Sequence, residues 1–73
     1  MVFRVFVMDV GSNEVISKRH LMFGQAVDTA LEWERVYNTD TLTHSVFIVN
    51  TLNNDTYLLN GTTFTKLAHK SLL

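Results

Sequence analysis

The chain has 73 residues, of which 47% are hydrophobic and 18% are charged, and its six basic and seven acidic residues give a net charge of -1. This length predicts a single domain over residues 1–73, near the size at which one hydrophobic core is barely sufficient. The sequence contains no cysteine, which excludes disulfides, thiolate metal sites and a cysteine nucleophile. The balanced charge provides no general attraction to nucleic acid or to an anionic membrane.

The composition is that of a globular protein, so we expect the chain to fold. Its apolar runs are much shorter than the roughly 20 residues that span a bilayer. The N-terminal residues enter a strand pattern directly and lack the features of a signal peptide. These observations predict a cytoplasmic protein with no membrane partner.

The first part of the chain is predicted to form a β-hairpin. Residues 2–10 alternate as a strand that is apolar on both faces, and residues 11–13 are rich in turn formers. The second strand, over residues 14–21, is more polar. Its Lys18-Arg19-His20 segment suits the edge of a sheet, because basic side chains discourage unwanted strand addition.

The central part of the chain has the spacing of an amphipathic helix from Gly24 to about Tyr37. Ala26, Ala30, Trp33 and Tyr37 fall on one stripe, with polar residues on the opposite side. We expect the two aromatic residues of this stripe to anchor the helix to a sheet.

A second hairpin is predicted from two strand patterns, over residues 45–52 and 56–60, joined by the Asn-rich turn at 53–55. The tail from Thr62 fits either a short helix or a strand, and we favour a helix capped by Thr62 or Thr63. The predicted fold class is therefore α+β. It consists of an antiparallel sheet of about four strands in ββαββ order, with the long helix packed on one face and a short C-terminal element.

The predicted strands are apolar on both faces, but the sequence offers only one long helix to cover them. The second face must then be covered by the tail, by a second copy or by another protein, since exposed apolar patches of this kind usually mark interaction sites. We select four residues as candidate partner-binding residues, although the strand register decides which way they face. They are Phe6, Met8, Phe47 and Val49.

These features predict a small non-enzymatic protein-binding module that acts through an apolar sheet face or edge. The expected partner is another protein or a second copy of the chain, and we expect a homodimer. The short length and the lack of catalytic motifs are typical of viral or phage-encoded proteins that inhibit or modulate a host protein, although no motif links the chain to a family. A homodimeric structural protein is an alternative.

Single-stranded nucleic-acid binding is a second alternative. The Lys18-Arg19-His20 cluster supplies cations, and Phe3, Phe6 and Phe47 are strand aromatics of the kind on which bases stack. The chain lacks the glycine and basic pattern of sheet-based RNA binders, and its net charge is negative. A nucleic-acid partner is therefore disfavoured.

The residues that could support catalysis or metal binding do not form a known pattern. His20, His44 and His69 lack metal-ligand spacing. Asp9 and Glu34 interrupt apolar patterns, but Asp9 ends a strand beside a turn and Glu34 can reach solvent from the last helical turn. We expect no catalytic residue, no cofactor and no metal.

Overall fold

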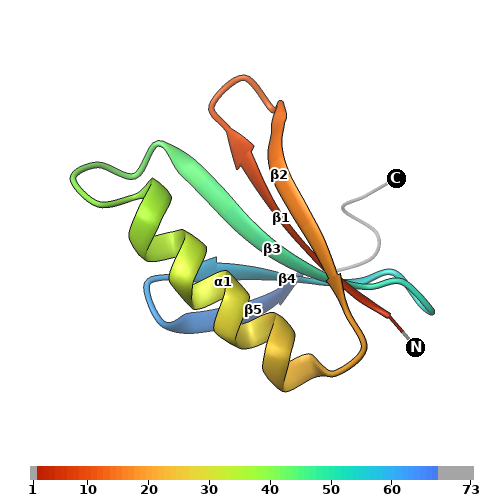
Figure 1. The fold of residues 1–73 in the computed structure, drawn as a ribbon. Helices are drawn as coiled ribbons and strands as arrows, with labels where there is room; N and C mark the ends of the chain where they lie inside the picture. Colours follow the sequence, from red (N-terminus) through yellow and green to blue (C-terminus); the bar gives the residue numbers. More distant parts are fainter. Residues whose placement is uncertain (1, 68–73) are drawn as a thin grey trace.

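The computed structural model describes residues 2–67 of the chain, and their fold is shown in Figure 1. The elements in chain order are β1 (Phe3–Asp9), β2 (Glu14–His20), α1 (Phe23–Tyr37), β3 (His44–Asn50), β4 (Asp55–Asn60) and β5 (Thr63–Leu67). The α+β class is confirmed. The sheet has five strands, so the expectation of about four strands in ββαββ order was only roughly right.

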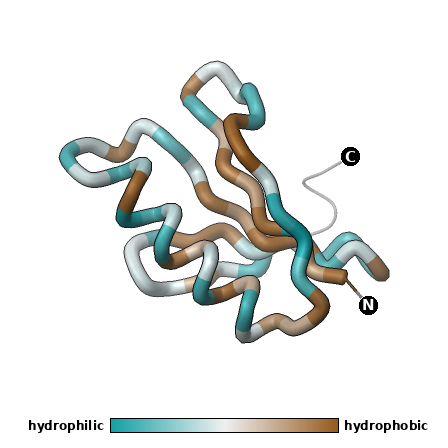
Figure 2. Tube along the Cα trace, viewed as in Figure 1, coloured by the Kyte–Doolittle hydropathy of each residue, from teal (hydrophilic) through white to brown (hydrophobic). Residues whose placement is uncertain are grey.

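The strands form one antiparallel sheet in the order β2-β1-β3-β4-β5. The two predicted hairpins are both present, and the pairing of β1 with β3 joins them into a single sheet. Helix α1 is the connection between the hairpins. Because β1 and β3 lie at the centre, their apolar residues form the middle of both sheet faces, and Figure 2 shows the hydrophobic colour along these strands.

The segment after β4 forms a strand instead of the expected helix. Gly61 adopts a φ of 67°, which glycine tolerates without strain, and the turn there directs the chain back along β4. Thr63 and Thr65 favour a strand because they are β-branched. The prediction of a helix was therefore wrong over Thr63–Leu67, and its remainder, residues 68–73, lies outside the described part of the chain.

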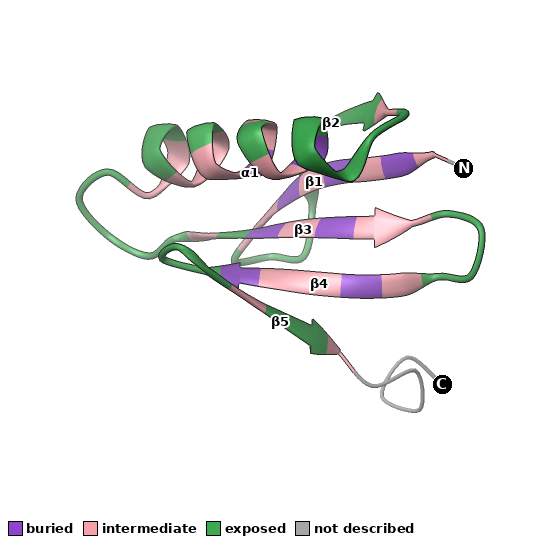
Figure 3. Cartoon of the chain, turned by 90° about the horizontal axis from the view of Figure 1, so that it is seen from below, coloured by how far each residue is buried: buried purple, intermediate pink, exposed green. Residues whose placement is uncertain are grey.

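Helix α1 covers one face of the sheet, as Figure 3 shows. Strand alternation places Val5, Val7, Val46 and Ile48 beneath it, and each of these four side chains is fully buried at 0% exposure. They form the core together with two alanines of the helix, Phe3 and Leu59. The hydrophobic core therefore lies entirely between this sheet face and α1.

The contact between α1 and the sheet is made by small side chains. Ala26 and Ala30 are fully buried, which lets the helix axis approach the strands closely. Trp33 and Tyr37 pack against the core from the side and stay partly exposed. The two aromatic residues thus contribute to the packing as expected, but the alanines form its centre.

Asn38 ends the helix and also holds the connector to β3. Its backbone N–H donates a hydrogen bond to the Glu34 backbone carbonyl. Its side-chain oxygen accepts hydrogen bonds from the backbone N–H groups of Thr43 (3.1 Å) and His44 (2.9 Å). Its side-chain amide donates to the His44 carbonyl at 3.0 Å. One side chain therefore determines where β3 begins relative to the end of the helix.

Candidate functional site: the open face of the sheet

The sheet face that α1 leaves uncovered is called the open face below. Phe6 lies opposite Phe47 in the ladder, and Val49 lies opposite Arg4. All four candidate residues, including Met8, therefore lie on this one face and are partly exposed. Leu58 of β4, opposite Phe47, and Leu67 of β5 extend it toward the other edge of the sheet. The open face therefore carries apolar side chains on four neighbouring strands.

An aromatic stack occupies the centre of the open face. The rings of Phe6 and Phe47 lie 5.0 Å apart between centroids, with an interplanar angle of 17°. The guanidinium of Arg4 lies over the Phe6 ring at 4.7 Å from its centroid and forms an ion pair with Glu14. Arg4 is thereby held by an aromatic face and by a carboxylate at once.

Two arginines meet at the β2 side of the open face. Arg4 and Arg19 lie directly opposite each other in the β1–β2 ladder, an arrangement that is unfavourable for like charges. Glu14 neutralises Arg4, while Arg19 has no ion-pair partner among the described residues. This leaves an uncompensated positive charge beside the apolar surface. The sequence identifies Arg19 only as part of a basic cluster. Its position opposite Arg4 follows from the register of the β1–β2 ladder.

The Lys18-Arg19-His20 cluster does not form one patch. Lys18 and His20 lie opposite Val5 and Phe3, on the side of the sheet that faces α1. The His20 Nε2 is 2.8 Å from the Thr29 hydroxyl of the helix, so this histidine ties β2 to α1. Of the three basic residues, only Arg19 belongs to the open face.

The three strand aromatics are divided in the same way. Phe3 lies under the helix, where its ring meets the Phe23 ring edge-on at 5.2 Å, so it is not available on the open face. Phe6 is on the open face, but its ring is already engaged by Phe47 and by Arg4. A base that stacked on this ring would have to displace one of these contacts.

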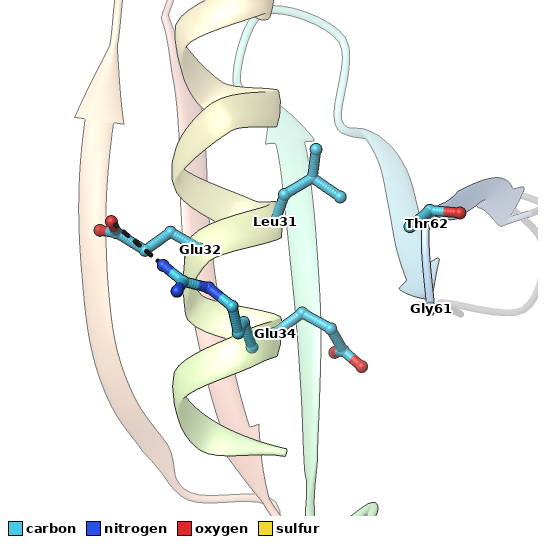
Figure 4. A pocket seen from close by; sticks show the side chains of 6 residues that line it. Leu31, Glu32, Glu34, Gly61 and Thr62 are labelled. Atoms are coloured by element: carbon cyan, nitrogen blue, oxygen red, sulfur yellow. Dashed lines mark ion pairs between the residues drawn. The ribbon is translucent and has the colours of Figure 1, made fainter. Parts of the chain in front are cut away.

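A groove of about 470 Å³ separates the C-terminal half of α1 from the β4–β5 turn. Figure 4 shows Leu31 and Glu34 on the helix side of the groove and Gly61 and Thr62 on the turn side. The Glu34 carboxylate accepts a hydrogen bond of 2.9 Å from the Asn38 amide, and Glu32 forms an ion pair with Arg35 at 3.9 Å. The charged groups of the groove are thus tied to neighbours on the same helix segment.

Asp9 organises the β1–β2 turn. Its Oδ1 accepts hydrogen bonds of 2.9 Å from the backbone N–H groups of Gly11 and Asn13. The bond from the Asn13 backbone is the main cause that lowers the pKa of this carboxyl below its ordinary value of 3.8. Ser12 takes the positive φ, of 62°, between them. This is the backbone role that the sequence predicted for Asp9.

The histidines are separate from one another in the structure. The His44 ring packs on the Tyr37 ring at 5.2 Å, and its Nδ1 is 2.8 Å from the Thr43 hydroxyl. His44 begins the central strand β3, whereas His20 ends the edge strand β2. His69 lies outside the described residues. Within residues 2–67, no three side chains of the metal-binding types come together.

No family model matches the chain, and no curated protein or solved structure matches it either. Helix α1, the helix of the described part, is too short and too polar to cross a membrane.

Proposed function

We propose that the protein is a non-enzymatic binding module that docks a different protein through the open face. The observation that carries this proposal is the Phe6–Phe47 stack at the centre of an uncovered apolar surface. A sheet face of this composition gains free energy when it is removed from water, at about 25 cal/mol per Å² of apolar surface. A partner surface provides that burial where the fold does not.

The charge of the open face supports a foreign partner over a second copy on this surface. Its charged residues in the described strands are Arg4, Glu14 and Arg19, and the one carboxylate is already paired with Arg4. Two open faces placed together would bring the Arg19 side chains into the interface without a free carboxylate to meet them. A partner with an apolar centre and a carboxylate at its rim complements this face better.

The size of the open face indicates a modest affinity. Five strands spaced ~4.8 Å apart and 5 to 7 residues long make a face of roughly 20 Å by 20 Å. This footprint is about half of the roughly 800 Å² that each partner contributes to a standard interface. We therefore expect reversible binding, with most of the energy from Phe6, Phe47 and their apolar neighbours.

Single-stranded nucleic acid is the weaker candidate for this face. The Phe6 ring is engaged by neighbours, Arg4 is neutralised by Glu14, and Lys18 is turned toward α1. These positions support a protein partner, because a nucleic-acid platform needs free ring faces and free cations. We expect no binding to single-stranded oligonucleotides in a fluorescence anisotropy titration at low salt.

A capture experiment with two matched variants tests the proposal. Val49→Thr removes an apolar group from the open face, and Val36→Thr makes the same change on the exposed surface of α1. Quantitative mass spectrometry of proteins captured from a cell extract should show one that Val49→Thr loses and Val36→Thr retains. Equal losses in both variants, or no protein sensitive to Val49, would contradict the proposal. Modulation of a host protein remains a prediction that the identity of the captured protein would test.

A further inference from the structure

The two edges of the sheet differ in how they are protected against pairing with another strand. The β2 edge carries Lys18 and Arg19, and its ladder with β1 is interrupted by a register shift between Val7 and Met8. Charges and bulges of this kind are how natural sheets keep an edge from pairing. The ladder of β5 with β4 runs without a shift from Thr63 to Leu67. The described sheet thus has one guarded edge and one regular edge.

Lys66, the one charged residue of β5, does not protect the free edge of this strand. Lys66 lies opposite Tyr57 and its ammonium is 3.4 Å from the Asp55 carboxylate of β4. The ion pair draws this side chain back across the hairpin. Thr63 and Thr65, two exposed residues of β5, are β-branched and favour a paired strand.

The hairpin turn determines which backbone groups of β5 point outward. Asn60 and Thr63 flank the two-residue turn, and a turn of this kind is closed by a bond from the Thr63 N–H to the Asn60 carbonyl. Antiparallel ladders alternate from this pair, so the backbone groups of Thr65 also face β4 while those of Phe64 and Lys66 face the free edge. These outward groups need a partner strand or water.

We infer that β5 pairs antiparallel with β5 of a second copy of this chain, joining two sheets edge to edge. A two-fold axis at Thr65 makes the five residues of β5 fully overlap. Phe64 then lies opposite Lys66 of the second copy, which allows about four backbone hydrogen bonds while the Lys66 ammonium keeps its ion pair with Asp55. On the open-face side, Thr65 meets Thr65 and Thr63 meets Leu67, so no like charges oppose each other.

The edge contact and the open face are separate surfaces. Joining the sheets at β5 leaves Phe6 and Phe47 exposed in both copies, because these residues lie on β1 and β3. The dimer would therefore present two open faces to partners instead of covering them. Loss of the dimer and loss of the docking partner are consequently distinguishable by different variants.

Charged substitutions of Thr65, the residue at the two-fold axis, test the inference. The molecular mass in solution is measured by light scattering over a concentration series. The wild-type mass should rise toward twice the 8.4 kDa of one chain. Thr65→Lys and Thr65→Glu should each remain near the single-chain mass, because each places two like charges opposite each other at the axis. An equimolar mixture of the two variants should recover the dimer, which a merely unfolded variant could not do.

Two control variants identify the surface that carries any dimer. Ser17→Lys introduces the same charge on the open-face side of the β2 edge, and Val49→Thr alters the open face itself. Both should dimerise like the wild type. A wild type that stays monomeric, a Thr65→Lys variant that dimerises normally, a mixture that fails to recover, or a dimer lost in either control would each overturn the inference.

Discussion

The two faces of the sheet are built from similar residues but have different environments. On the covered face, Val5, Val7, Val46 and Ile48 are completely buried beneath α1. On the open face, Phe6 and Phe47 alternate with these residues along the same two strands but remain partly exposed. Hydrophobicity alone therefore does not determine burial in so small a domain. The position of its single long helix does.

The largest expected effect is on the covered face. Ile48→Ala removes a side chain with 0% exposure and leaves a cavity under the helix, which should lower the free energy of unfolding by about 3 kcal/mol. Urea denaturation followed by circular dichroism measures it. Phe47→Leu, the neighbouring position on the open face, should cost less than about 1 kcal/mol. Similar losses in the two variants would break the distinction between the faces.

Val46 and Val49 are the same residue type on the covered and the open face of β3. Val46→Thr places a hydroxyl in the fully buried core, which should cost about 2 kcal/mol, because the new polar group loses its water. Val49→Thr makes the same change on the open face, where the hydroxyl stays near solvent, and should cost about 0.5 kcal/mol or less. Thermal unfolding of both variants provides the measurement. A Val49→Thr variant as unstable as Val46→Thr would show that the open face is covered in solution.

A smaller effect, opposite in sign, is expected at Arg19. Arg19→Thr removes one of two like charges that lie opposite each other, so the free energy of unfolding should rise by a few tenths of a kcal/mol at low salt. Binding of the proposed partner should weaken at the same time, because the rim cation is lost. Denaturant unfolding together with the capture assay checks both changes. A less stable variant would contradict the predicted repulsion between the two arginines, and undiminished partner binding would argue against a binding role for Arg19.

The smallest effect concerns the pH dependence of the turn beside β1. The folded-state pKa of Asp9 is lowered, mainly by the backbone bond from Asn13, so the stabilisation by this carboxylate is present above its ordinary pKa of 3.8. It is lost as the pH falls from that value through the lowered folded-state pKa. Asp9→Asn should therefore be less stable than the wild type at neutral pH, and the difference should shrink below pH 3.8. Urea denaturation at pH values on both sides of this window tests it, and a difference that does not change with pH would contradict it.

Much of the fold follows from local patterns in the sequence. The apolar run of residues 2–10 and the helical spacing up to Tyr37 predict the elements that the structure contains, because a strand and a helix have different side-chain periods. The same reasoning places Phe6, Met8, Phe47 and Val49 as candidates. Whether they share a face depends on the pairing of β1 with β3, which joins residues far apart in the chain, such as Phe6 and Phe47. Local sequence patterns do not predict the register between β1 and β3.

The wrongly predicted C-terminal helix and basic cluster have a common physical cause. The spacing of Phe64 and Leu67 fits a helical stripe as well as a strand, and only the ladder that β4 offers decides for β5. Likewise, Lys18, Arg19 and His20 are consecutive, so the sequence alone predicts one basic cluster. Strand alternation sends them to opposite faces, so the predicted basic patch does not exist as a unit.

The most direct test of the open face as a docking surface is site-specific photo-crosslinking. A benzophenone amino acid is introduced in place of Phe47, or in place of Val36 on the exposed side of α1 as the control, and each protein is irradiated in cell extract. The proposed function predicts a discrete adduct with another protein from position 47 and none from position 36. An adduct only from position 36, adducts only between two copies of the chain at position 47, or no adduct from position 47 would contradict it.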